Sequence, residues 1–155
     1  MAKRQFTLEA GRRHPLGAHP DEGGVNFAVY AEDASAVELL LFDEHDDPEP
    51  VANFQLDPEV HNTFHMWHAY VGGAKPGLHY AYRVDGPQDL HETGRRFNRN
   101  KVLIDPYAYG NTANLWNRGD AVGPDDNLAT SMRSVVVDSS DYDWEGDLPL
   151  NRPMS

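Results

Sequence analysis

The chain has 155 residues, a formal net charge of −12 at pH 7 and no cysteine. Hydrophobic residues make up 39% of it, too many for a disordered chain, so we expect one domain or one domain with an arm. The acidic surface argues against nucleic acid or an anionic membrane as the main partner, because both would repel it.

The N-terminus carries basic residues with no apolar stretch behind them, so it does not resemble a secretory signal. No window approaches the roughly 18 apolar residues that a membrane helix needs. The lack of cysteine excludes a disulfide framework and thiolate chemistry, and it fits a reducing compartment. We therefore expect a cytoplasmic protein that does not span a membrane.

Strand signals dominate the first two thirds of the chain. Eleven prolines and thirteen glycines cut the sequence into short pieces, and no long 3.6-residue periodicity occurs. The strand-like runs lie at residues 25–31, 36–42, 51–57, 64–71 and 78–84. Short strands at this spacing, with turn residues between them, predict an all-β protein of the β-sandwich class.

Alternation within two of these runs predicts which faces are buried. The run at 25–31 places Val25, Phe27 and Val29 on one face. The run at 36–42 is apolar on both faces, so we expect something to cover this strand on each side.

The pattern changes after about residue 90. Beyond it we find a short apolar run in "KVLIDPYA" and one further strand signal, at residues 135–137, amid glycine, proline and aspartate. We predict a flexible N-terminus at 1–10, a sandwich at 11–90 and a long, mostly irregular C-terminal arm at 91–155. A structureless run of this length is unusual in a compact domain, which indicates that another domain covers it.

Four histidines form the only candidate metal cluster. On a helix, His61, His65 and His68 would share one face, a plausible zinc arrangement. On a strand, His65 and His68 point to opposite faces. We favour the strand, and therefore predict no metal site here or at the nearby His79.

The carboxylates offer no catalytic pair. They gather in the segment 43–50, predicted to be a solvated hairpin tip, and in 138–145. A glycosidase needs two carboxylates on a rigid frame, and these lie in loops. No Gly-x-Ser-x-Gly and no glycine-rich phosphate loop occurs either. We expect no catalytic residue and no cofactor in this chain.

Aromatic residues are the remaining functional signal. Flat rings can cover the apolar C–H faces of sugars, although such residues more often fill a core or an interface. The candidates are Tyr30, Trp67, Tyr82, Trp116 and Trp144.

Three segments carry a family resemblance: "PLGAHPDEGGVNFAVYAEDASAVELLLFD", "WHAYVGGAKPGLHYAYRVDGP" and "RRFNRNKVLIDPYA". From about Gly11 onward the chain resembles the N-terminal region of bacterial glycogen debranching enzymes of the isoamylase type, in glycoside hydrolase family 13. The third segment is the most specific, since it is similar to the "RFNPNKLLLDPYA" of those enzymes, with Arg99 in place of the proline. The resemblance implies a carbohydrate-binding module of family 48, with an immunoglobulin-like β-sandwich fold.

The resemblance also implies that catalysis takes place in a different domain from this one. A catalytic (β/α)8 barrel, which hydrolyses α-1,6-glucosidic branch links, is expected after residue 155, and none of its motifs is present here. Glycogen-binding relatives use tryptophan, lysine and tryptophan at positions that hold Tyr30, Ala81 and Gln88 in this chain. Only Tyr30 keeps an aromatic ring, so we expect at most weak α-glucan binding.

The module is therefore expected to dock on the barrel and stabilise it. The candidate barrel contacts are Val102, Ile104, Tyr107, Trp116 and Trp144. Two alternatives stay open: an autonomous glycogen- or starch-binding domain, and the N-terminal module of a trehalose-forming or branching enzyme. The third segment argues against the latter.

Overall fold

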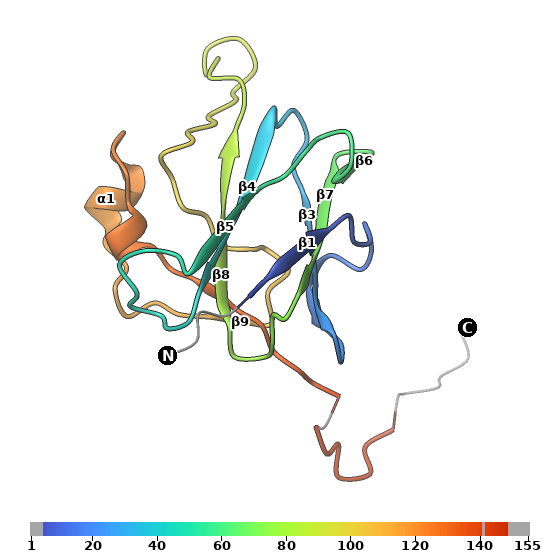
Figure 1. Cartoon of the computed structure of the whole chain (residues 1–155). Helices are drawn as coiled ribbons and strands as arrows, with labels where there is room; N and C mark the ends of the chain where they lie inside the picture. Colours follow the sequence, from blue (N-terminus) through green and yellow to red (C-terminus); the bar gives the residue numbers. More distant parts are fainter. Residues whose placement is uncertain (1–4, 141, 149–155) are drawn as a thin grey trace, which may run out of the picture.

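The structure is a computed structural model that describes residues 5–140 and 142–148. Two antiparallel sheets enclose a common hydrophobic core (Figure 1). The first sheet has the order β1 (Thr7–Glu9), β7 (Met66–Gly72), β3 (Gly24–Tyr30) and β2 (Gly17–Pro20), with β6 (Asn62–Thr63) also paired to β7. The second has the order β5 (Ala52–Gln55), β4 (Ala36–Phe42), β8 (His79–Asp85), β10 (Ser134–Val135) and β9 (Gly110–Asn111).

Helix is scarce in the described part of the chain. It contains one short α-helix, α1 (Arg118–Val122), and one 3-10 helix, η1 (Leu128–Thr130). The all-β sandwich followed by a mostly irregular arm, predicted from strand spacing, is confirmed.

The core forms where the predicted alternation places it. Val25, Phe27 and Val29 on β3 are buried and face inward with their register partners on β7, which include Trp67. The Phe27 ring meets the Tyr80 ring of the opposite sheet at a centroid distance of 5.0 Å. Each such buried side chain contributes about 1.5–3 kcal/mol of hydrophobic stabilisation, which makes this layer the main source of cohesion.

Strand β4 is covered on both faces, as its composition predicted. Leu39 is buried in the main core, whereas Leu40 and Phe42 point the other way and are buried in a second cluster. The cover on that second face comes from the arm, because Val102 packs there beside Ala81 of β8.

The run predicted as one strand at 64–71 begins only at Met66. Phe64 and His65 instead form the two-residue turn of the β6–β7 hairpin, with φ values of 51° and 67°. Such turns usually contain Asn-Gly or Asp-Gly, because both central residues adopt left-handed backbone. Two bulky residues gave no such signal, so the turn was missed.

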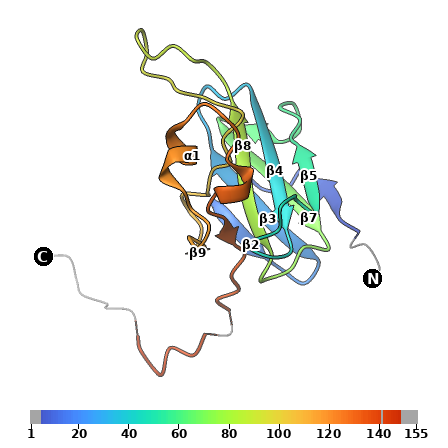
Figure 2. The same ribbon diagram turned by 90° about the vertical axis from the view of Figure 1, so that its left-hand side faces the viewer.

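The arm adds strands to the sandwich. Leu103 exchanges two backbone hydrogen bonds with Tyr82 of β8, at 2.8 and 2.9 Å, and β10 then pairs with β8 and β9. The predicted strand at 135–137 is observed at Ser134–Val135. Figure 2 shows α1 and β9 on the flank of the sandwich, while residues 138–140 and 142–148 run away from the body. These strands have two residues each, too short for periodicity to reveal.

A buried carboxylate holds this arrangement together. Asp105 is 1% exposed, accepts hydrogen bonds from the Tyr80 hydroxyl and the Tyr107 N–H, both at 2.8 Å, and donates its own N–H to Ser134 Oγ at 2.9 Å. Burial raises the pKa of the Asp105 carboxyl, while the bonds from Tyr107 and Tyr80 partly oppose that shift. Through its carboxylate and its backbone N–H, Asp105 thereby joins β8, the arm and β10.

A second buried group ties the arm to the loop at 43–50, predicted to be a solvated hairpin tip. The Arg133 side chain is fully buried, and its guanidinium lies 3.7 Å from the centroid of the Phe42 ring. It donates hydrogen bonds to the backbone oxygens of Glu44 at 3.1 Å and Asp47 at 2.6 Å. Arg133, which belongs to the arm, therefore anchors this loop.

We expect the Asp105→Asn substitution to remove a pH-dependent contribution to the free energy of unfolding. Because burial raises the folded-state pKa, the contribution of Asp105 to stability is fully present below its unfolded value of about 3.8 and is lost as pH rises through the folded value. The free energy of unfolding of the native chain, relative to the variant, should therefore decrease from low pH towards neutrality. Urea unfolding from roughly pH 3 to pH 7 measures this difference. An increase with pH would show that hydrogen bonding outweighs burial.

Arg133→Met should destabilise the chain by about 2–4 kcal/mol, because two charge-assisted hydrogen bonds and the cation–π contact with Phe42 are lost, while methionine still fills most of the buried space. Arg118→Met is the matched control, since Arg118 lies exposed on α1. Urea unfolding of both variants gives the comparison. Equal, small losses would mean that Arg133 does not hold the 43–50 loop.

Candidate functional site

A hollow of about 410 Å³ lies where β3 and β8 end, and we call it the Tyr30 hollow. Its lining residues are Tyr30, Ala31, Val84, Arg96, Phe97, Asn98, Lys101 and Leu103. The Tyr30 side chain is 47% exposed. Phe97 can pack here because residue 86 is glycine: a Cβ atom at Gly86 would lie 2.7 Å from the Phe97 ring.

Most polar groups of this hollow are already bonded within the chain. The Tyr30 hydroxyl donates to Glu32 Oε2 at 2.8 Å, which raises the pKa of that tyrosine. The Asn98 amide donates to the Pro124 oxygen at 3.1 Å, and its own oxygen accepts from a backbone N–H. Among the described residues, Arg96 has no hydrogen bond or ion pair, so it is the hollow's one uncommitted cation.

Lys101 is buried and serves the arm itself. Its ammonium group donates to the backbone oxygens of Asp120, in α1, and Asp125, shortly after it. Arg95 forms an ion pair with Asp33 at 2.6 Å, on the turn between β3 and β4. Two cations of the segment "RRFNRNK" thus hold the arm in place.

The three positions that the resemblance implies for glycogen contact are not all at the surface here. Ala81 is fully buried in the cluster that contains Val102, so it cannot contact a sugar. Gln88 is exposed and lines an adjoining hollow of about 240 Å³, which shares Arg96, Phe97 and Asn98 with the Tyr30 hollow. Of these three positions, only Tyr30 has an aromatic ring at the surface.

Two of the other aromatic candidates are core residues. Trp67 and Tyr82 are almost completely buried, so they pack inside the sandwich and cannot stack on a sugar. Trp116 and Trp144 are 46% and 66% exposed.

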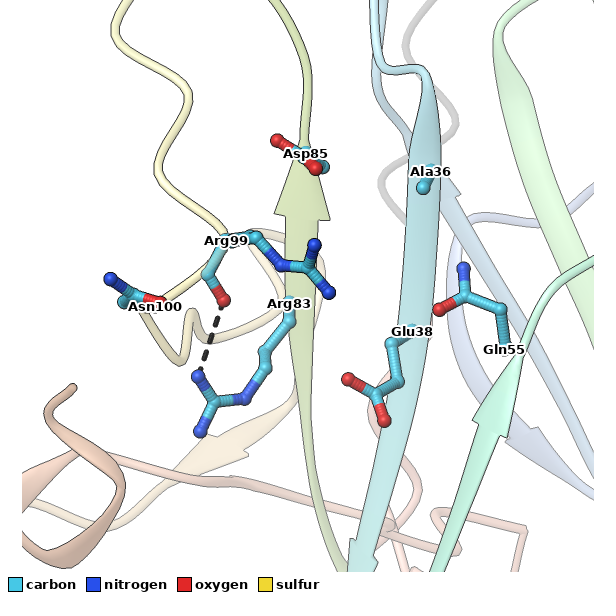
Figure 3. A pocket seen from close by; sticks show the side chains of 7 residues that line it. All are labelled: Ala36, Glu38, Gln55, Arg83, Asp85, Arg99 and Asn100. Atoms are coloured by element: carbon cyan, nitrogen blue, oxygen red, sulfur yellow. Dashed lines mark hydrogen bonds between the residues drawn. The ribbon is translucent and has the colours of Figure 1, made fainter.

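A polar groove of about 360 Å³ crosses the outer face of the second sheet (Figure 3). It is lined by Ala36, Glu38, Gln55, Arg83, Asp85, Arg99 and Asn100. Figure 3 shows the guanidinium groups of Arg83 and Arg99 on the arm side of the groove. The Glu38 carboxylate lies across from them on β4. Sequence reasoning missed this groove, because isolated charges on alternating strand positions are what any solvated face shows. Glu38 and Arg83 lie opposite each other in the register of β4 and β8, and only the tertiary structure shows this.

The groove has a fixed wall and several uncommitted polar atoms. Arg83 donates to the Arg99 oxygen at 3.2 Å and pairs with Asp126 at 2.6 Å, which anchors its guanidinium. Glu38 accepts from the Asn53 amide at 2.7 Å through one oxygen only. Within the described part of the chain, the Arg99 guanidinium has no partner. Two cations face two carboxylates here, so the groove suits a neutral ligand rich in hydroxyl groups better than an ion.

The predicted barrel contacts lie in different environments. Val102 is only 5% exposed because it packs on the sandwich, but it also lines the hollow in which Ile104 and Trp116 meet. Ile104 and Trp116 come together in a hollow of about 180 Å³, the arm hollow, which Leu103 and Met132 also line.

The other two predicted contacts lie apart from the arm hollow. Tyr107 is exposed and is not among the residues that line it. Trp144 lies in the segment that leaves the body, where its ring meets that of Tyr142 at 4.9 Å.

The histidines are bonded individually. The His61 ring accepts the Asp57 N–H at 3.0 Å, and the His68 ring contacts the Ala10 oxygen at 2.7 Å and Thr63 Oγ1 at 3.0 Å. In residues 5–140 and 142–148, no three metal-ligating side chains gather. No helix in those ranges has the length and apolar character to cross a membrane.

Comparison with known proteins gives a consistent family. The model for carbohydrate-binding module 48, described as the isoamylase N-terminal domain, matches residues 15–108. The chain is 41% identical over 152 residues to a glycogen debranching enzyme of Cronobacter sakazakii, covering 94% of this chain and 22% of that protein. It is 38% identical over 149 residues to the chloroplastic isoamylase 1 of Oryza sativa subsp. japonica, covering 93% and 18%. The chain thus spans about a fifth of the length of these relatives.

Solved structures support the fold. The product complex of the multi-modular glycogen-degrading pneumococcal virulence factor SpuA superimposes with a TM-score of 0.59 at 20% identity, covering 85% of this chain and 13% of that one. The GBS pullulanase SAP in complex with maltotetraose superimposes with a TM-score of 0.57 at 20% identity, covering 86% of this chain and 16% of that one. Since the family model matches more than half of the sequence, the chain belongs to the carbohydrate-binding module 48 family, that of the isoamylase N-terminal domain.

Proposed function

We propose that the chain is the N-terminal module of a glycogen debranching enzyme whose catalytic (β/α)8 barrel follows it, and that it docks on that barrel. The observation that carries this proposal is the match along nearly the whole chain, arm included, to proteins about five times as long. On this proposal the parent hydrolyses α-1,6 branch links of glycogen in the cytoplasm. The module itself supplies no catalytic residue.

The arm hollow supports docking. Trp116, Leu103 and the half-buried Ile104 present apolar surface beside one another on a segment that the sandwich already holds in place. Exposed aromatic and aliphatic side chains around a concavity are typical of an interface core. Because the arm is ordered by Asp105 and Arg133, docking costs little further conformational entropy.

The polar groove supports weak α-glucan binding. It offers unpaired donors and acceptors, such as the Arg99 guanidinium, that can bond sugar hydroxyls. It lacks the flat aromatic platform that would supply apolar contact, since Tyr30 lies outside it. An autonomous glycogen-binding domain would need that platform.

We expect Trp116→Ala in the full-length parent to weaken coupling between module and barrel by about 2–4 kcal/mol, the range of an interfacial hot spot. In the isolated chain the same change should cost roughly 0.5 kcal/mol or less, as for other surface positions. Val122→Ala, at an exposed position of α1 outside the hollow, is the control. Calorimetric unfolding of parent and isolated chain separates the two effects. Identical losses in both would contradict docking through the arm hollow.

Isothermal titration with maltoheptaose should give a dissociation constant in the millimolar range or weaker, about −4 kcal/mol or less favourable. Arg99→Ala should weaken it further, because the groove loses its uncommitted cation. Tyr30→Ala tests the remaining prediction that this ring contacts glucan. Micromolar affinity that disappears in Tyr30→Ala would favour the autonomous binding domain.

A further inference from the structure

We propose that the Tyr30 hollow is a second docking socket, which receives an apolar side chain from the catalytic part of the parent rather than a sugar, with Arg96 pairing to an acidic group beside it. This inference rests on the proposed function, because it requires the module to dock on the rest of its own chain.

The polar chemistry of the hollow argues against a sugar. A glucose ring presents several hydroxyl groups, each of which needs a partner when it leaves water. In the Tyr30 hollow the tyrosine hydroxyl is committed to Glu32, the Asn98 amide to the arm, and the Lys101 ammonium to two backbone oxygens. Arg96 is left as the one free cationic group among the described lining residues.

The apolar lining favours a protein side chain. Ala31, Val84, Phe97 and Leu103 form most of the wall, and the Tyr30 ring adds a flat side. Filling such a hollow removes apolar surface from water at about 25 cal/mol per Å². The free guanidinium of Arg96 then selects a neighbouring carboxylate, which forms a charge-assisted hydrogen bond with it.

The hollow is preformed. The Phe97 ring fits against Gly86, where any larger residue would displace it, and Arg95 binds the segment to Asp33 and Asp89. Lys101 fixes the far wall to the arm. A socket whose walls are already ordered loses little entropy when it is filled.

Continuity with the arm hollow identifies the occupant. Leu103 and Lys101 line both hollows, so a partner seated against Ile104 and Trp116 borders the Tyr30 hollow without a gap. The relatives are about five times as long as this chain, so most of such a parent is available to cover both.

Thiol labelling tests this proposal, since the chain has no cysteine of its own. Tyr30→Cys is compared in the isolated chain and in the full-length parent, with peptide mapping to locate the label. We expect at least tenfold slower labelling in the parent. Phe64→Cys, at a 79% exposed aromatic position on the β6–β7 turn, should label equally fast in both.

Two further comparisons distinguish the possible outcomes. If Trp116→Cys is protected in the parent while Tyr30→Cys labels fast, the socket is wrong and docking through the arm hollow stands. If both label fast in the parent, the proposed docking fails as well. If maltoheptaose protects Tyr30→Cys in the isolated chain and the parent does not, the hollow is a glucan site and the proposal is overturned.

Discussion

The buried Asp105 carboxylate is the constraint on which the rest of the module depends. The carboxylate joins the Tyr80 hydroxyl of β8 to the arm. The backbone N–H of the same residue donates a hydrogen bond to Ser134 Oγ, at the start of β10. Once β10 is seated, Arg133 lies over Phe42 and holds the neighbouring loop. The arm then covers the outer face of β4, which would otherwise expose Leu40 and Phe42 to water.

Covering that face also changes what the surface can bind. Ala81, one of the three positions that the resemblance implies for glycogen contact, becomes core beneath Val102. The sheet stays open only beyond the arm's edge, where Glu38, Arg83 and Arg99 leave a polar groove. The edge of the arm itself is apolar. One packing event therefore separates a hydrophilic groove from two apolar hollows, and the proposals of weak sugar binding and of docking both rest on this separation.

The cations of "RRFNRNK" show how a cluster in sequence divides in space. Arg95 pairs with Asp33, and Lys101 satisfies carbonyl groups at the end of α1, so both stabilise the module. Arg96 and Arg99 remain uncommitted among the described residues, one in the Tyr30 hollow and one in the groove. Four basic residues that lie close together in sequence thus serve two structural and two surface roles.

The sequence by itself determined the sandwich, the inward faces of β3 and β4, and the need for a cover over β4, because alternation records which side of each strand leaves water. It left the Phe64–His65 turn and the polar groove undetected. Apart from Tyr107, the hydrogen-bond partners described for Asp105 and for the Arg133 side chain lie 25 to 89 residues away along the chain. Only the tertiary structure decided those contacts, since hydrogen bonds between distant groups leave no periodic trace in sequence, and burial of a charge is tolerated only where such partners meet it.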